Sequence, residues 1–301
     1  MPKPKIDINW AYQKAVSYSQ YSIYRQCQYQ WYLSYIKKES SFKPSIYLVY
    51  GTAMHETIQT YLQTMYDKSV KAADEIDLNK LLEDRLVANY KESIADNKNE
   101  HFSTKEELKE FLSDGQLTLD WFKKNRGKYF SKKNTELIGI EIPILQPVLE
   151  DIPNVLMNGS IDFIIYDKIL EKYTIYDIKT STKGWSDYEK KDQTKLNQIL
   201  LYKRFYSKVM NVPEDKVDVM FFIVKRKVFS HPDYPIYRIQ EFIPANGKRK
   251  VQEAIDDLSS FIRECFTPNA KYNSDRVYVK NTNSCKFCPY TNKPDLCDKK
   301  V

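Results

Sequence analysis

Glycine is scarce in this chain, with 7 residues among 301, and histidine occurs only three times. Collagen-like and disordered low-complexity chains have very different compositions, so both classes are excluded. No run of about 18 apolar residues is present, which excludes an ordinary transmembrane helix. The opening residues, MPKPKIDINW, have no apolar run after their lysines, so we expect no signal peptide. A G-x-x-x-x-G-K-[ST] loop is also missing, so the chain carries no recognisable nucleotide-driven motor.

The composition that remains is that of a globular protein. Hydrophobic residues make up 42% of the chain and aromatic residues 14%, enough for a substantial core. Lysine and arginine number 47 against 40 acidic residues, a formal charge of +7 that permits a polyanionic partner without requiring one. The 24 tyrosines and many Lys, Asn and Ile are typical of AT-rich coding, including that of phages. We expect a soluble cytoplasmic protein, in the host cytoplasm if a phage encodes it.

Hydrophobic periodicity and composition change along the sequence, and these changes divide the chain into four segments. Residues 1–50 include a helix that opens at Ser17 or Ser19, and residues 51–134 are helical with a helix expected from about Thr52. Strand-like alternation begins near residue 135 and continues, mixed with helices, to residue 266. Residues 267–301 are polar, irregular and rich in cysteine. No repeat or low-complexity linker separates the segments, so we predict one α/β body with a helical insertion.

Two of the predicted strands carry acidic residues and a lysine. The first contains Gly159-Ser160-Ile161-Asp162 and the second, after a short turn, Asp177-Ile178-Lys179. Because side chains alternate along a strand, Asp177 and Lys179 share one face and Asp162 can meet Asp177 across the pair. The two carboxylates and the Ile178 carbonyl are hard oxygen ligands suited to Mg²⁺ or Mn²⁺. Lys179 beside such an ion can orient a water or stabilise charge on phosphorus.

A D-x-K tripeptide alone is common and equally fits a surface ion pair. Two further features lie near it in the predicted fold. Gln198 and Tyr202, spaced i and i+4, share one face of the following helix. His55 follows Gly51 by four residues at the start of a predicted helix, although a single histidine is more often structural.

These motifs together resemble the RecB-like PD-(D/E)XK nucleases, in which G-x-x-x-H, G-x-x-D, D-x-K and Q-x-x-x-Y occur in the same order. The resemblance covers residues 17–297 and implies a restriction-endonuclease-like core with a central mixed sheet. It implies that His55, Asp162 and Asp177 bind the metal and that Lys179 is the catalytic lysine. Gln198 and Tyr202 would contact the DNA backbone or hold the active site in shape. Glu141, on the preceding strand, is a further acidic candidate.

The cysteines form a separate pattern near the C-terminus. Cys285 and Cys288 are spaced C-x₂-C, and Cys297 follows eight residues later. Three local thiolates are one short of closing a tetrahedral zinc or a [4Fe–4S] site. The spacing leaves Cys27, Cys265 or His231 as the fourth ligand, while Cys265 also fits a buried apolar position.

The segment around Cys27, SYSQYSIYRQCQYQWYL, resembles the helix that supplies the first cluster cysteine in iron–sulfur nucleases of this lineage. AddB and CRISPR-associated nucleases place one cysteine early and three at the C-terminus. The resemblance therefore implies a [4Fe–4S] cluster on Cys27, Cys285, Cys288 and Cys297, although the eight-residue gap before Cys297 departs from the family pattern. Zinc or no metal at all are the alternatives.

A basic and aromatic stretch supplies a candidate nucleic-acid surface. Its members are Trp121, Lys123, Lys124, Arg126 and Lys128. Cations can hold phosphates while rings stack on unpaired bases. The alternative is a solvated helix end with its rings in the core. Related folds further suggest that the helices of residues 56–130 arch over the active site and admit a DNA end.

The sequence thus predicts a metal-dependent deoxyribonuclease, an exonuclease on single-stranded DNA ends. Recombination and repair are the expected settings. The alternative is a non-cutting or partner-dependent DNA-binding subunit of a helicase–nuclease or CRISPR adaptation complex. Processing of RNA would use the same site.

Overall fold

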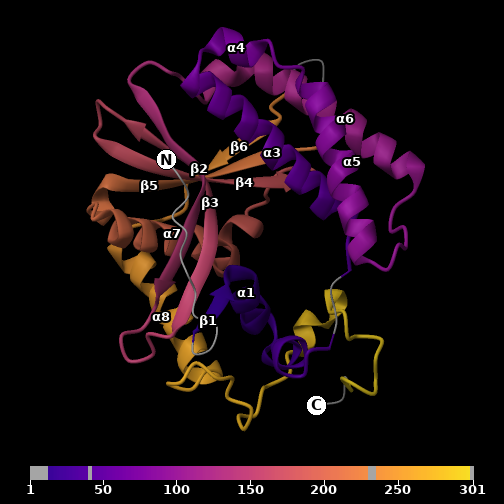
Figure 1. Ribbon diagram of the computed structural model, residues 1–301, viewed down its shortest axis with the longest axis vertical. Coiled ribbons are helices and arrows are strands. Elements are labelled where there is room, and N and C mark those ends of the chain that lie inside the picture. The colour runs from indigo at the N-terminus through magenta and orange to yellow at the C-terminus, as the bar shows by residue number, and fades with distance from the viewer. Residues whose placement is uncertain (1–12, 40–42, 230–234, 299–301) are drawn as a thin grey trace.

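A mixed sheet of six strands lies at the centre of the molecule (Figure 1). The computed structural model describes residues 13–39, 43–229 and 235–298. Strand β3 is central because it pairs with three neighbours: β1 in parallel, β2 and β4 in antiparallel. Strand β5 runs parallel to β4, and β6 closes that edge. The strands are β1 (Lys14–Ser17), β2 (Thr135–Pro147), β3 (Val155–Asp167), β4 (Lys172–Ser181), β5 (Val217–Lys225) and β6 (Ile239–Phe242).

Helices cover both faces of this sheet (Figure 1). The helices that precede β2 are α1 (Tyr18–Gln26), α2 (Gln28–Trp31), a π-helical turn η1 (Tyr32–Ile36), α3 (Ile46–Asp67), α4 (Val70–Asp74), α5 (Leu78–Asp96) and α6 (Lys105–Asn125). Those that follow β4 are α7 (Gln193–Met210) and α8 (Lys248–Cys265). Short 3₁₀ turns are η2 (Arg126–Lys128), η3 (Glu189–Lys191), η4 (Glu214–Lys216) and η5 (Thr282–Phe287).

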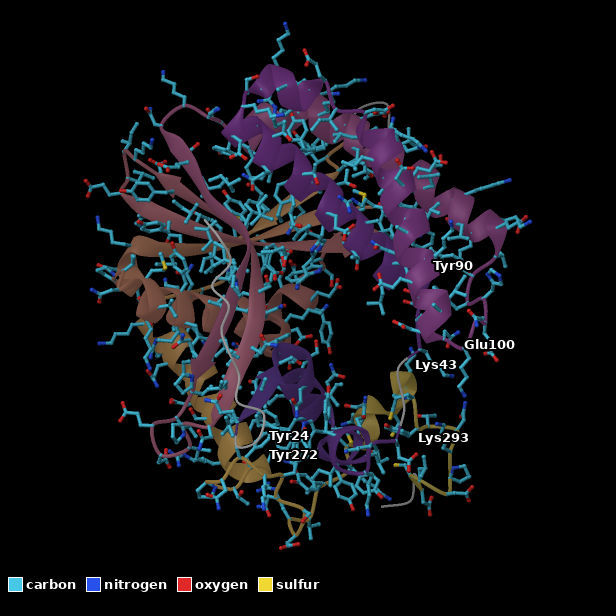
Figure 2. The ribbon with its side chains drawn as sticks, viewed as in Figure 1. Tyr24, Lys43, Tyr90, Glu100, Tyr272 and Lys293 are labelled. Carbon is cyan, nitrogen blue, oxygen red and sulfur yellow. The ribbon has the colours of Figure 1, made fainter. Side chains whose placement is uncertain are left out.

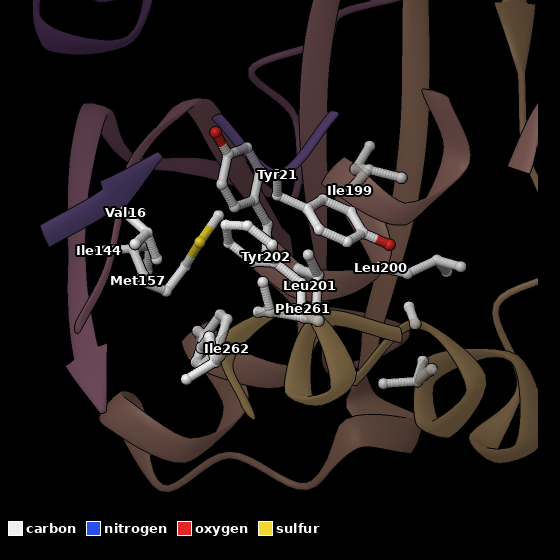
Figure 3. Packing of buried hydrophobic residues seen from close by; sticks show 14 of the residues in the cluster. Val16, Tyr21, Ile144, Met157, Ile199, Leu200, Leu201, Tyr202, Phe261 and Ile262 are labelled. Atoms are coloured by element: carbon white, nitrogen blue, oxygen red, sulfur yellow. The ribbon is translucent and has the colours of Figure 1, made fainter. Parts of the chain in front are cut away.

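The two faces of the sheet bury separate hydrophobic clusters. On one face, α1, α7 and α8 pack around Tyr21, Met157 and Phe261, as Figure 3 shows. On the other face, α3, α5 and α6 pack against Phe163, Ile178 and Phe222. Burying apolar area on both faces is what makes a layered α/β arrangement stable. Strand β4 is therefore packed against side chains on both of its faces.

The strands and most helices predicted from the sequence are confirmed. Ser17 caps α1, since its hydroxyl accepts a hydrogen bond from the Gln20 N–H at 3.1 Å. The prediction for the second helix was wrong at its start: α3 begins at Ile46 behind the Ser45 cap. Gly51 and His55 thus lie inside α3. Among the residues with described coordinates, no helix is long and apolar enough to span a bilayer.

The first helical stretch is shorter than its sequence suggests. Cys27 adopts extended backbone angles, φ −159° and ψ 113°, which end α1 and start α2. Residues Lys14–Ser17 form β1, a strand the sequence pattern did not predict. The break turns Cys27 away from a continuous helix and toward the C-terminal segment, whose Asn281 N–H lies 3.4 Å from the Cys27 Sγ.

Gly115 of α6 tests the packing of the helical layer. A Cβ at this position would lie 2.6 Å from Leu82 Cδ2 and 3.0 Å from Tyr50 Cε2. We expect Gly115→Ala to lower the melting temperature, because overpacking costs about 1–3 kcal/mol and exceeds the gain of about 1 kcal/mol in helix propensity. Gly127→Ala is the matched control, since nothing lies within 4 Å of its Cβ. Equal melting of both variants, measured by circular dichroism, would contradict this packing.

Candidate active site

The candidate site lies where one edge of β3 is left unpaired. Strand β2 pairs with β3 along one edge, so β1 and β4 share the other. On that edge β1 pairs with residues 155–158 and β4 with residues 163–167. Within the described part of the chain, residues 159–162 between them, Gly-Ser-Ile-Asp, have no strand neighbour on this edge. Because β1 and β4 separate here, the backbone groups of residues 159–162 are free to bind side chains and ligands. We call this gap the fork.

Asp162 occupies this fork. Its Oδ2 accepts a 2.6 Å hydrogen bond from the Ile178 N–H, which lies just past the last β3–β4 pair, Phe163–Tyr176. The side chain therefore replaces the missing strand partner. His55 reaches the same carboxylate from α3, with its Nδ1 3.5 Å from Asp162 Oδ2. Only 14% of the Asp162 side chain and 26% of the His55 side chain are exposed.

Asp177 and Lys179 project from β4 beside Asp162. The Lys179 Nζ lies 2.8 Å from Asp177 Oδ2 and donates a 2.8 Å hydrogen bond to Gln198 Oε1 of α7. Gln198 in turn donates to the Tyr202 hydroxyl at 3.3 Å. The prediction that Gln198 and Tyr202 share one helix face is confirmed. Gln198 contacts the Lys179 ammonium, and Tyr202 contacts Gln198.

Two glycines permit the close approaches that assemble the site. A Cβ on Gly159 would lie 3.0 Å from the Tyr202 ring, so this residue lets α7 lie against the open edge of β3. A Cβ on Gly51 would lie 3.2 Å from the Thr180 hydroxyl, where α3 passes β4. Close packing thus explains why glycine occupies the first position of both short motifs.

Negative charge is in excess at the fork. Burial, and then the charge of Asp177, raise the pKa of Asp162 well above its usual range, while Lys179 acts in the opposite direction. Burial also raises the pKa of Asp177 against the effect of Lys179. Burial and the Lys179 charge lower the pKa of His55 to about 3, so its ring is neutral at pH 7. A neutral imidazole beside electron-rich carboxylates is a donor set that suits a divalent cation.

The side chains are not closed around an ion. Within residues 13–39, 43–229 and 235–298, no three His, Cys, Asp or Glu side chains form a group that could hold a metal as they stand. Asp177 instead faces the Lys179 ammonium. The chemistry of the donors nevertheless fits Mg²⁺ or Mn²⁺, since a cation would stabilise the charged form of two carboxylates whose pKa values burial raises.

Glu141 and Gln59 extend the site on the β2 side. Glu141 lies across from Asp162, between the Ile140–Phe163 and Ile142–Ile161 pairs of β2 and β3, and has φ +50°, a strained conformation for this residue. Its two carboxylate oxygens accept hydrogen bonds of 2.7 Å from Gln59 Nε2 and the Ser160 hydroxyl. Sequence reasoning identified Glu141 but missed Gln59, although Gln59 follows His55 by four residues on one helix face.

A groove of about 390 Å³ opens beside Lys179 and Gln198. Its walls come from one face of α1 and the first turns of α7, with Tyr18 near the carboxylates. Burial raises the pKa of the Tyr18 hydroxyl, and the nearby Tyr21 and Asp177 add to the effect. No sequence motif indicated Tyr18. A second groove of about 390 Å³, lined by Gln59 and Ile140, lies on the other side of α3.

Four cysteines line one small pocket at the opposite end of α1. They are Cys27, Cys285, Cys288 and Cys297, and the pocket volume is about 20 Å³. All four are free thiols. Burial raises the pKa of Cys288 and of Cys297, and their mutual proximity adds to this. Cys265 is buried in the core instead, and His231 lies outside the residues that the structure describes.

The basic and aromatic stretch lies at the C-terminal end of α6 and in η2. Trp121 is partly buried against Tyr129. Lys123 donates to the Ile76 carbonyl at 3.1 Å, and Arg126 lies 3.8 Å from Asp74. Lys124 and Lys128 are exposed. Part of this predicted nucleic-acid surface is thus engaged in contacts within the protein.

Comparison with known families agrees with this geometry. No curated protein matches the chain. The family model of the PD-(D/E)XK nuclease superfamily matches residues 15–293, a stretch that contains the whole sheet except the first residue of β1, and the fork with Asp162, Asp177 and Lys179. Metal-dependent hydrolysis of nucleic acid is the activity that this membership suggests. The chain belongs to the PD-(D/E)XK nuclease superfamily.

Proposed function

We propose that the protein is a metal-dependent deoxyribonuclease of the RecB-like type that hydrolyses phosphodiester bonds at single-stranded DNA ends. The observation that carries the proposal is the fork between β3 and β4. Two buried carboxylates, a neutral histidine and a lysine converge there, and the pKa of both carboxyl groups is raised. Recombination and repair are the settings in which such an activity is used.

Asp162, Asp177, His55 and the Ile178 carbonyl would hold Mg²⁺ or Mn²⁺. When bound, such an ion activates water and neutralises charge on the phosphate. The protein prepares for it by keeping His55 neutral and by holding Asp162 in place through the Ile178 N–H. To bind the ion, Asp177 would have to release the Lys179 ammonium, which would then be available to act on substrate.

Lys179 orients the attacking water and offsets the negative charge that develops on phosphorus. Gln198 fixes its Nζ through the 2.8 Å hydrogen bond, and Tyr202 fixes Gln198. This relay keeps a flexible side chain in one position, which lowers the entropy lost when the reactants align. Gln198 and Tyr202 therefore act through the lysine.

The four cysteines are proposed to hold a [4Fe–4S] cluster. The support is that all four line one pocket, although Cys27 is far from the other three in sequence. As they stand, the four thiols do not form a group that could hold a metal ion, so binding of a cluster would require them to rearrange. A cluster there would tie both ends of the chain together and hold α1, one wall of the groove, in place.

In this proposal each of four segments of the chain has its own role. Residues 1–50 supply the first cysteine, and residues 51–134 form the helical layer. Residues 135–266 form the nuclease core, and residues 267–301 supply the remaining cysteines. Figure 2 shows Tyr90 and Glu100 at the lower end of the helical layer, with Lys43 and Lys293 below them. We propose that this layer arches over the fork and restricts substrates to free ends.

The first test is cutting of end-labelled single-stranded DNA in Mn²⁺, Mg²⁺ or EDTA. We expect metal-dependent cutting of the linear strand and little of the same strand circularised. Lys179→Ala should slow cutting about a hundredfold or more, with strand binding retained. Lys172→Ala is the matched control, because it removes an exposed lysine of the same strand that pairs with Asp218. Parental cutting by Lys179→Ala would refute the assignment, and no cutting by the intact protein would favour a partner-dependent binding subunit.

Asp162→Asn should separate stability from activity. Its folded pKa is raised, so the ionised carboxylate destabilises the fold increasingly as pH rises above its unfolded pKa of about 3.9. The amide keeps an oxygen acceptor for the Ile178 N–H. We expect a higher melting temperature in EDTA, about 2–4 °C per kcal/mol relieved, with a larger gain at pH 8 than at pH 5. Cutting should be lost. A melting temperature below that of the parent at pH 8 would contradict the argument.

Metal analysis tests the cysteine site. Anaerobically purified protein should contain about four iron atoms per chain and absorb broadly in the visible range. Cys285→Ser should lose the colour and melt at a lower temperature, because three thiolates cannot close the site. Cys265→Ala is the matched control and should keep its iron, since that thiol lies in the core. Zinc in place of iron in the parent protein, or unchanged iron in Cys285→Ser, would overturn the cluster.

A further inference from the structure

The groove beside Lys179 continues past the catalytic residues along the loop that joins β4 to α7. Its floor is the end of β4, residues 179–181, and Trp185 and Glu189 of the loop line its side. The β4–β5 pairing carries on into this loop, since Lys227 N–H donates to the Thr182 carbonyl at 2.8 Å. The segment that follows β5 therefore lies next to the loop and close to the groove.

Two large aromatic rings stand almost fully exposed on these segments. Tyr188, between Trp185 and Glu189 of the groove wall, is 85% exposed, and Phe229 after β5 is 80% exposed. They are the most exposed aromatic side chains among the large hydrophobic residues in the described part of the chain. Contact of such large apolar rings with water is unfavourable, and no contact within the fold removes them from solvent.

Cations accompany the rings. The Lys183 Nζ lies 5.1 Å from the centre of the Phe229 ring, and Lys195 lies 5.2 Å from the Trp185 ring inside the groove. The acidic groups of the groove already have partners: Glu189 pairs with Lys195 at 3.3 Å, and Asp192 caps α7 through the Thr194 N–H at 3.0 Å. Because Lys195 is itself paired with Glu189, the cation that accompanies the exposed rings is Lys183, beside Phe229.

This combination fits one polymer. Bases of a duplex are stacked on one another, whereas those of a single strand are free to stack on protein rings while cations hold the phosphates. A volume of about 390 Å³ is in the range of clefts that enclose small organic groups. The hydroxyls of Tyr18 and Ser22 line the inner wall, where polar contacts to sugar and phosphate are needed.

We infer that one strand of DNA leaves the active site through this groove and that Tyr188 and Phe229 stack on its unpaired bases. The inference rests on the proposed nuclease function, because it takes the Lys179 side of the fork as the place where the strand meets the site. Lys183 holds the phosphate between the stacked bases. The contact adds binding at a distance from the scissile bond and favours single-stranded substrates.

The test is the affinity of the full-length protein for a fluorescein-labelled oligothymidylate, measured by fluorescence anisotropy in EDTA so that no cutting occurs. The double variant Tyr188→Ala and Phe229→Ala should bind about tenfold more weakly or worse. Its matched control is Ile169→Ala with Leu170→Ala, which trims two exposed apolar side chains at the β3–β4 turn. The control should bind within about twofold of the parent, and all three proteins should melt alike.

Parental affinity in the double variant would overturn the inference, even if the parent cuts DNA in Mn²⁺. Equal loss of affinity in the control variant would overturn it as well, since the effect would not be local. If affinity depends on the two rings but the parent does not cut in Mn²⁺, binding of a single strand in the groove is supported and the proposed nuclease function is contradicted. A duplex oligonucleotide should lose much less affinity than the single strand, and an equal loss would contradict stacking on unpaired bases.

Discussion

The active site depends on an interruption of strand pairing. Strand β3 pairs with β2 along most of one edge, while its other edge is shared by β1 and β4 with residues 159–162 left between them. That gap leaves the Ile178 N–H without a strand partner, and the Asp162 carboxylate takes the place of the missing carbonyl. It also leaves room for Tyr202 to lie against Gly159. Had β4 paired along the whole of β3, neither the carboxylate position nor the lysine relay could form.

The same gap concentrates charge that the fold does not neutralise. Asp162 and Asp177 are both buried, and one lysine serves them. Buried like charges cost folding free energy, which the large clusters on both faces of the sheet offset. In the proposed function a divalent cation would offset this cost, because it stabilises the charged form of both carboxylates. The strained backbone of Glu141 opposite Asp162 belongs to the same pattern, in which local stability is given up at a functional centre.

Much of this could be predicted from the sequence, for physical reasons. Alternation along strands places Asp177 and Lys179 on one face, and helical spacing places Gln198 beside Tyr202. The same spacing from His55 would have found Gln59 had it been applied there. Tyr18 and the groove could not be predicted, because they depend on how α1 packs against α7, a contact between segments distant in sequence. The break at Cys27 was also hidden, since SYSQYSIYRQCQYQWYL has continuous helical character.

The account stands on one claim, that Asp162, Asp177 and His55 form a divalent-cation site. The most direct measurement is a crystal structure of the protein grown with Mn²⁺, with anomalous differences recorded near the manganese edge. The account predicts a strong anomalous peak at the fork, within ligand distance of both carboxylates and the His55 ring, with Asp177 turned away from Lys179. A protein that crystallises in saturating Mn²⁺ with no peak at the fork, and with the Asp177–Lys179 pair intact, would contradict it.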